Sequence, residues 1–206
     1  MYLRKPKSCV LLAVVYYAVV LAGMYAIARL QYRGVRWYPL LYLLLAGLPA
    51  VWVLFREKDL ASVGIPKEGK SRDLLLAGLI VAALVTGACL LGRRSVGENI
   101  RMALYYLFCI ALVEEMVYRG FLQSYLMGLL ELGIGENGCY AIGGLIFSLA
   151  HIPFHMLNYD SVLVGIPQLV FAFVFHICMC RVADRRQSIW QCVAIHFAVD
   201  YVQRIV

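Results

Sequence analysis

Long apolar stretches are the feature that most limits how this chain can fold. A helix needs roughly 20 apolar residues to cross the hydrocarbon core of a bilayer, which is about 30 Å thick. The sequence contains seven stretches near or above that length: Ser8–Leu30, Trp37–Phe55, Leu74–Leu91, Met102–Leu126, Cys139–Leu157, Val162–Cys180 and Ile189–Val206. These stretches predict an all-α fold, a polytopic membrane helical bundle with about seven transmembrane helices.

The last stretch differs from the others because polar residues interrupt it. These residues are Gln191, His196, Asp200, Gln203 and Arg204. Polar side chains within a membrane usually face the bundle interior or a water-filled cavity, since contact with lipid is costly. We therefore expect this helix to line a polar intramembrane cavity.

The composition agrees with a membrane protein of one domain. Of the 206 residues, 63% are hydrophobic and 15% are charged, and the mean hydropathy is +0.80. Soluble proteins average about 25% charged residues. We expect a single membrane domain over residues 1–206, with three membrane helices within 1–101 and the remaining helices within 102–206.

The net charge of +7 does not indicate nucleic-acid binding. Basic residues are scattered among the predicted loops, and no RNA- or DNA-binding module with interleaved aromatic residues is present. Basic residues that flank membrane helices set the topology and contact lipid headgroups. The seven cysteines form no CxxC pair, and we interpret them as small buried hydrophobic residues.

The amino terminus resembles either a signal peptide or a first membrane helix. Arg4, Lys5 and Lys7 precede an apolar run from Cys9 to Ala28. The apolar part of a signal peptide covers about 7 to 15 residues, so the longer run favours an uncleaved helix. Loops on the side of the amino terminus hold more Lys and Arg, which predicts a cytoplasmic amino terminus. The expected location is integral and multi-pass, in the cell membrane if the host is prokaryotic.

Three charged residues lie within the apolar stretch Met102–Leu126. A charge at the bilayer centre costs about 2.5–3.5 kcal/mol on insertion scales. Glu115 and Arg119 are at positions i and i+4 on one helical face, where they can neutralise one another. Glu114 lies about 100° around the helix from Glu115, so it can point elsewhere.

A second polar cluster lies near the end of Cys139–Leu157. Phe147, His151 and His155 share one helical face. Pro153 cannot donate its backbone nitrogen to Leu149, so we expect a kink that opens backbone groups toward a cavity.

The third cluster is the pair His196 and Asp200, again at positions i and i+4. The imidazole and the carboxylate therefore face the same way. Asp200 can accept a proton from one ring nitrogen and so fix the tautomer of His196.

Each cluster has a structural explanation as well as a functional one. A lone membrane histidine such as His176 is more often a packed or interfacial residue than a catalytic one. A lone Glu–Arg pair in a bundle is about as often structural as functional. Three costly clusters on three helices are harder to explain by packing alone, because polar groups in one bundle interior tend to meet.

The three clusters resemble the motifs of a known family. EEMVYR (Glu114–Arg119) fits EExxxR, FSLAH (Phe147–His151) fits FxxxH, and HFAVD (His196–Asp200) fits HxxxN or HxxxD. The chain thus resembles the CAAX-protease and bacteriocin-processing family, abbreviated CPBP and also called Abi. The resemblance covers the carboxy-terminal half, from Met102 on, and it implies a catalytic core at 102–206. It implies a helical bundle with a membrane-embedded cavity that opens toward the cytosol.

The resemblance also implies catalytic roles. Glu114 and His151 would activate the attacking water, and His196 with Asp200 would stabilise the oxyanion. Because an ionised carboxylate repels an oxyanion, we assign Asp200 to orienting His196 or to acting in its protonated form.

Structural support of the site is assigned to three further residues. Arg119 is expected to hold Glu115, and Phe147 belongs to the FxxxH motif. A metal remains an open alternative, because Glu114, His151 and His196 would make a His₂Glu zinc set. HExxH is missing, and we favour metal-independent water activation with no cofactor required. His155 is either an extra ligand or, in the preferred interpretation, a residue at the cavity rim.

The predicted function is that of an intramembrane endopeptidase. Its partners would be membrane lipid and a protein or peptide substrate, either a lipidated CAAX-type protein or a peptide such as a bacteriocin precursor. The alternative is a non-catalytic membrane immunity or scaffold protein that keeps the pocket for binding. A proton-coupled transporter is disfavoured, because inverted repeats and paired broken helices are not visible in the sequence. The sequence does not determine the oligomeric state.

Overall fold

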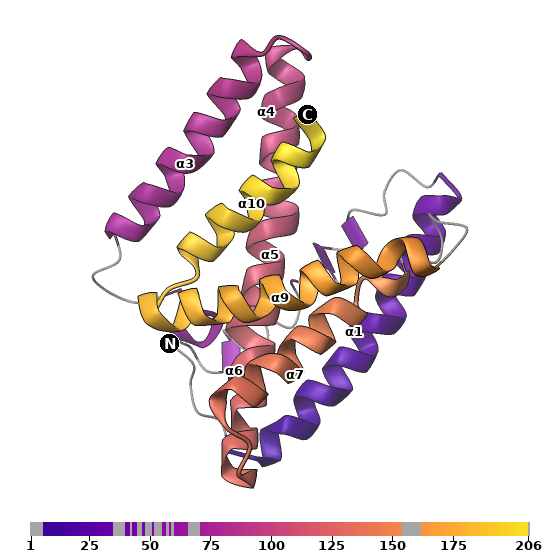
Figure 1. Ribbon diagram of the computed structural model, residues 1–206, viewed down its shortest axis with the longest axis vertical. Coiled ribbons are helices and arrows are strands. Elements are labelled where there is room, and N and C mark those ends of the chain that lie inside the picture. The colour runs from indigo at the N-terminus through magenta and orange to yellow at the C-terminus, as the bar shows by residue number, and fades with distance from the viewer. Residues whose placement is uncertain are drawn as a thin grey trace.

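The computed structural model describes residues 6–34, 60–65, 71–153 and 162–205, with a few further residues between 40 and 58. The regular structure of these residues is helical (Figure 1), so the all-α prediction is confirmed. The longest helices are α1 (Ser8–Tyr32), α3 (Ser71–Leu90), α7 (Glu136–Leu149), α9 (Val162–Arg186) and α10 (Trp190–Ile205). A short 3₁₀ turn, η1 (Leu60–Val63), precedes α3.

A further helical path runs without interruption between α3 and α7. Its segments are α4 (Val96–Leu104), η2 (Tyr105–Ala111), α5 (Leu112–Glu114), η3 (Glu115–Leu122), α6 (Gln123–Leu126) and η4 (Met127–Leu132). Ser95 begins the path with a capping box, in which Ser95 and Glu98 each accept from the other's backbone nitrogen. Gly133 ends it in the left-handed conformation, at φ 82°, which glycine adopts without strain.

Two segments of this path, η2 and η3, are π-helical. The sequence predicts a regular helix over Met102–Leu126, so the π turns are a departure from that prediction. A π turn closes hydrogen bonds from i to i+5, which places more residues in each turn. Glu114 is the last residue of α5 and Glu115 is the first of η3, so the helical register changes between the two glutamates.

Three described helices are long and apolar enough to cross a membrane. They are α1, α3 and the Gly165–Arg186 part of α9, with mean hydropathies of 2.3, 2.2 and 1.8 over their most apolar windows. Fewer than a third of the residues in each window are buried inside the protein, so most of their apolar surface faces outward. These helices identify an integral membrane protein, as predicted.

The prediction of seven transmembrane helices is not supported in full. As described, α7 has 14 residues and α10 has 16, which at 1.5 Å per residue reach only about 21 Å and 24 Å. The path around Met102–Leu126 carries Glu114, Glu115 and Arg119 and is divided into short segments. Most of Trp37–Phe55 lies outside the described residues, and the predicted orientation of the amino terminus stays a prediction.

The region before Pro153 differs from the predicted kink within one continuous helix. The helix ends at Leu149, and Ala150 and His151 form a turn before Pro153. The predicted bounds, Cys139–Leu157, were wrong at the start, because α7 begins at Glu136. The residues from 154 to 157 lie outside those described.

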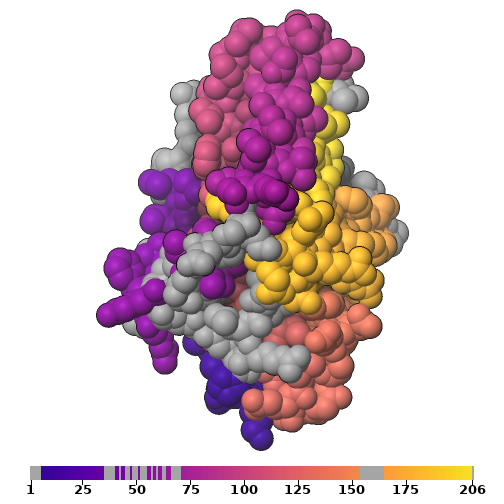
Figure 2. Space-filling view, turned by 90° about the vertical axis from the view of Figure 1, so that its left-hand side faces the viewer, coloured from indigo at the N-terminus to yellow at the C-terminus, as the bar shows by residue number. Residues whose placement is uncertain are grey.

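Apolar clusters hold the helices together, and the two largest among the described residues surround the Val96–Leu132 path. One joins α1 to η3, α6 and α7, and in it the ring of Tyr16 meets that of Phe121 edge to face, with centroids 5.2 Å apart. The other joins α10 to α3, α4 and η2 around Phe197 and Tyr201, whose rings stack 5.0 Å apart. Figure 2 shows α3, in magenta, at the upper end of the molecule beside the yellow residues of α10. The central part of the Val96–Leu132 path thus contacts both clusters.

Candidate active site

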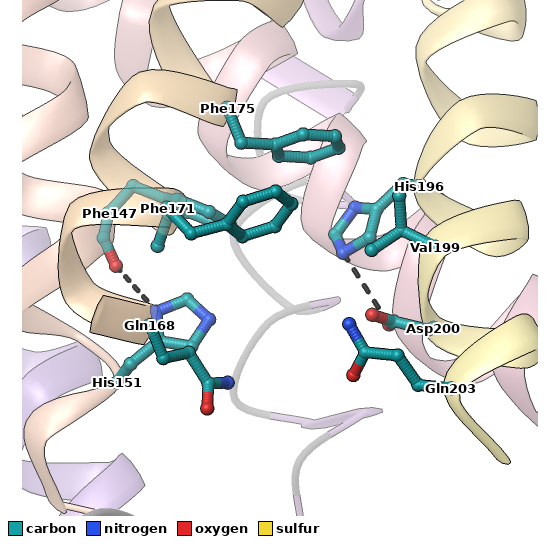
Figure 3. Close-up of a pocket in the computed structure, with 10 residues that line it drawn as sticks. Phe147, His151, Gln168, Phe171, Phe175, His196, Val199, Asp200 and Gln203 are labelled. Carbon is teal, nitrogen blue, oxygen red and sulfur yellow. Dashed lines mark hydrogen bonds and ion pairs between the residues drawn. The ribbon is translucent and has the colours of Figure 1, made fainter. Parts of the chain in front are cut away.

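A pocket lies where α7, α9 and α10 meet, and the second and third sequence clusters both reach it (Figure 3). Its volume is about 70 Å³, enough for a few water molecules. The lining residues are Phe147, His151, Gln168, Phe171, Ala172, Phe175, His196, Val199, Asp200 and Gln203. The described residues do not show the larger polar cavity that the sequence predicts.

His196 is held from one side by Glu115. Nδ1 of His196 donates to Oε1 of Glu115 at 2.7 Å, and both side chains are buried. A carboxylate only accepts hydrogen bonds, so this contact fixes a proton on Nδ1 and leaves Nε2 facing the other way. The sequence assigns the tautomer of His196 to Asp200, whereas Glu115 makes the short contact.

Arg119 neutralises Glu115 from the same helical path. Its Nη1 lies 2.9 Å from Oε1 of Glu115, as the i, i+4 spacing predicts, and both side chains are completely buried. The guanidinium carbon also lies 4.3 Å from the ring centroid of Phe147 and 5.5 Å from that of Phe175. Cation–π contact is stronger in such a desolvated setting. Among the described residues, no side-chain nitrogen of Arg119 has a hydrogen bond of good geometry, so the ion pair and the rings stabilise its charge.

Two more carboxylates flank the other nitrogen of His196. Nε2 lies 3.7 Å from Oε2 of Glu114 and 3.6 Å from Oδ2 of Asp200. These distances exceed that of a direct hydrogen bond, so the contacts are electrostatic. Glu114 is buried at 9% relative exposure, and the side chain of Asp200 is 26% exposed and lines the pocket. The first and third clusters of the sequence therefore converge on one imidazole.

His151 stands across the pocket from His196 in Figure 3. Its Nδ1 donates to the backbone oxygen of Phe147 at 2.8 Å, so in the neutral ring Nε2 holds a lone pair. The Phe147 ring lies between the two histidines, with its centroid 4.9 Å from that of His151 and 6.4 Å from that of His196. Phe147 thereby sets the spacing of both rings.

All seven residues assigned to the site fall within the described residues, and His155 lies outside them. The sequence did not point to Phe175, whose ring lies 5.4 Å from that of His196 and close to Arg119. Phenylalanines are common in the apolar stretch around it, so the sequence offers no signal that distinguishes this one. Gln168, a polar residue in the same apolar stretch, was also missed, whereas Gln203 was identified only as a polar interruption.

The geometry of the candidate metal ligands is given by the described residues alone. Among the residues that the structure describes, no three His, Cys, Asp or Glu side chains are arranged to hold a metal ion. One nitrogen of each candidate histidine is already engaged, in His151 by a backbone oxygen and in His196 by Glu115. The remaining nitrogen of His196 lies 3.7 Å from Oε2 of Glu114 and 3.6 Å from Oδ2 of Asp200.

Comparison with known proteins gives one match. The family model described as type II CAAX prenyl endopeptidase Rce1-like matches residues 96–202, which include all three clusters. No curated protein and no solved structure matches the chain.

Proposed function

The chain belongs to the Rce1-like family of type II CAAX prenyl endopeptidases, and on that premise we propose that it is an intramembrane endopeptidase that hydrolyses a peptide bond near the carboxyl terminus of a lipidated, CAAX-type protein. A peptide such as a bacteriocin precursor is the other substrate class that the motifs allow. The match begins at residue 96, so the proposal concerns the site in the carboxy-terminal half.

The convergence of three sequence clusters on His196 carries this proposal. Three carboxylates lie around the imidazole, and Arg119 neutralises one of them. Burial of so many ionisable groups is costly unless they interact closely or serve a chemical purpose. Peptide hydrolysis needs a base, a donor for the oxyanion and an acid for the leaving amine, and this set of groups can supply all three.

Glu114 is the proposed base. Its carboxylate, which lies 3.7 Å from Nε2 of His196 at the pocket wall, would take a proton from a water molecule as the water oxygen attacks the carbonyl carbon of the substrate. His151 would help to orient that water through Nε2, the nitrogen that is not engaged with Phe147. Glu114 would then return the proton to the nitrogen of the leaving amine as the C–N bond breaks.

His196 is the proposed donor to the oxyanion. Because Nδ1 donates to Glu115, Nε2 can donate only when the ring carries both protons. The carboxylates of Glu114 and Asp200 supply counter-charge for that form. Asp200 is therefore assigned to supporting a charged His196, in place of the tautomer role that Glu115 fills.

We propose that the reaction needs no metal, and no step above passes through one. This proposal is supported by the ligand geometry, since the candidate ligands lack a common point among the described residues. Activity that survives dialysis against a strong zinc chelator is the expected outcome. Loss of activity on chelation, restored by zinc alone, would overturn this part of the mechanism.

The pocket wall suggests how the substrate is held. Phe171 and Phe175 of α9 form an apolar part of the pocket lining, whereas Gln168, Asp200 and Gln203 place polar groups at its other side (Figure 3). Because the pocket has room for only a few water molecules, the peptide substrate would lie along its rim, where its amides can pair with these polar groups.

The proposal is tested with purified protein in lipid nanodiscs. Two peptides of identical sequence that end in a CAAX motif, one farnesylated and one not, are incubated with the protein. Release of the last three residues, measured by mass spectrometry, supports the endopeptidase, and preference for the farnesylated peptide supports a lipidated substrate. Failure to cleave either peptide, together with failure on a bacteriocin-leader peptide, favours the non-catalytic binding protein.

A further inference from the structure

A second buried polar group, separate from the proposed catalytic residues, lies on α6 and α9. Nε2 of His176 donates to Oε1 of Gln123 at 3.1 Å, and both side chains are buried at 1% and 0% relative exposure. His176 is the lone histidine that the sequence left as a packing residue. The hydrogen bond shows that it has a specific buried partner.

Gln123 connects three helices. It lies on α6, directly after the segment that carries Glu115 and Arg119. Its Nε2 donates to the backbone oxygen of Cys139 on α7 at 3.3 Å, and its Oε1 accepts from His176 on α9. The Sγ of Cys180, one turn beyond His176, also donates weakly to Oε1 at 3.7 Å. Gln123 therefore fixes the helix of the paired glutamates against the helix that leads to His151.

Gly143 on α7 leaves the space that this arrangement needs. A Cβ atom at position 143 would collide with Oε1 of Gln123 and would lie 2.8 Å from Nε2 of His176. Close approach of helices in a membrane depends on such small residues. Gly143 lies one turn before Phe147, so the same face of α7 contacts both the polar pair and the site.

His176 reaches the proposed catalytic residues through Phe147. The two rings are 5.4 Å apart and tilted by 36°. Phe147 in turn packs against the guanidinium of Arg119 and the rings of His151 and His196. A displacement of His176 would therefore displace the Phe147 ring and, through it, the side chains that contact this ring.

We propose that the Gln123–His176 pair is a positioning device for the active site. It holds α6, α7 and α9 at the separation that keeps Phe147, and with it Arg119 and His196, in place. The pair lies outside the pocket, so it acts on the geometry of the reaction and not on substrate contact. The kinetic test of this inference rests on the proposed function. The structural test rests only on the described contacts.

Two variants remove the hydrogen bond while they keep the volume of the side chains: His176→Phe and Gln123→Met. His176→Gln keeps a donor near the position of Nε2 and serves as the conservative variant. Cys178→Ala is the matched control, because Cys178 is exposed on the same helix. All four are compared with the wild type in nanodiscs, with the farnesylated CAAX peptide as substrate and at equal amounts of folded protein.

The expected result is a kcat that falls ~10–100-fold in His176→Phe and in Gln123→Met, with KM within about threefold of the wild type. His176→Gln recovers most of the rate, and Cys178→Ala is unchanged. A pair that only packs would lower the thermal stability without changing kcat per folded molecule. That result in both variants overturns the proposal.

The structural test does not depend on activity. In protein labelled with ¹⁵N-histidine, the Nδ1 proton of His196, bound to Glu115 at 2.7 Å, should give a strongly downfield NMR signal. We expect this signal to shift in His176→Phe and in Gln123→Met, and to stay in place in Cys178→Ala. An unshifted signal in both variants contradicts the proposal, even if the wild type cleaves no peptide and the proposed function fails.

Discussion

His196 donates from Nδ1 to Oε1 of Glu115 across 2.7 Å, and this hydrogen bond joins the last helix of the chain to the helix of the paired glutamates. The same oxygen lies 2.9 Å from Nη1 of Arg119. One carboxylate thus fixes the tautomer of an imidazole and compensates a buried guanidinium. Glu114, next to it in the sequence, faces the opposite nitrogen of the imidazole.

Glu115→Gln should destabilise the protein by about 3–5 kcal/mol, because it leaves the buried charge of Arg119 without its counter-ion. Thermal unfolding in nanodiscs measures the loss. The isosteric change at Glu114 is the matched control and should cost much less, since the contact of Glu114 with His196 is longer, at 3.7 Å, than the 2.9 Å ion pair between Glu115 and Arg119. Equal stability of the two variants would contradict a structural role for Glu115.

Arg119→Lys should lower the stability by about 2 kcal/mol although the charge is kept. The ammonium group lacks the flat surface that the guanidinium presents to the rings of Phe147 and Phe175. Activity should fall as well, because Phe147 then loses one of its neighbours. A lysine variant that matches the wild type in both properties would show that the ion pair alone holds the site.

Substitutions of Asp200 separate the two ways in which this residue can act. Asp200→Asn should keep activity within about tenfold of the wild type, because an amide can donate directly to the oxyanion. Asp200→Ala should lose ~100-fold or more, since it removes both the counter-charge and any donor. The initial rate of peptide cleavage measures both. If the asparagine variant is as inactive as the alanine variant, the carboxyl group itself is required.

The capping box at the start of α4 predicts a pH effect outside the site. Hydrogen bonds from the side chain and backbone of Ser95 hold the pKa of Glu98 below its ordinary value of 4.5. A lowered folded-state pKa means that Glu98 contributes stability above its unfolded pKa, and this contribution disappears as the pH falls through the lower folded value. The wild type should therefore lose more stability than Glu98→Gln when the pH is lowered from 6 to about 3.

Ser95→Ala is the companion variant for the capping box. It removes the side-chain oxygen that accepts from the backbone nitrogen of Glu98, and loss of such a cap costs about 1 kcal/mol. Peptide cleavage should be unaffected, because Ser95 lies far along the chain from the pocket residues and outside their contacts. A loss of activity without a loss of stability would be inconsistent with a local cap.

The sequence predicted the helical class and the meeting of three polar clusters because both follow from local rules. The length of an apolar stretch indicates a membrane helix, and a charged side chain in such a helix needs a partner of opposite charge or a polar contact. The partner of Nδ1 of His196 was predicted incorrectly. The i, i+4 spacing pairs His196 only with Asp200 on its own helix, whereas Glu115 lies on another helix. The π segments η2 and η3 were missed because apolar periodicity does not distinguish them from α-helix.

The contacts of Phe147 and Phe175 with Arg119 also escaped prediction. Both rings come from helices other than that of Arg119, and their positions depend on how three helices pack. The hydrogen bond between Gln123 and His176 was missed for the same reason. The two residues lie in separate apolar stretches, and a single sequence does not indicate that they contact one another. Long-range side-chain pairing is the part of the site that only the folded chain reveals.

The proposed role of Glu114 as the base is tested most directly by cleavage of the farnesylated CAAX peptide in H₂¹⁸O, with the wild type and Glu114→Gln compared at equal amounts of folded protein. We expect the wild type to place one ¹⁸O in the new carboxylate, whereas Glu114→Gln should be at least ~100-fold slower and keep its thermal stability. Cleavage by Glu114→Gln at the wild-type rate would contradict the assignment of the base and with it the proposed mechanism.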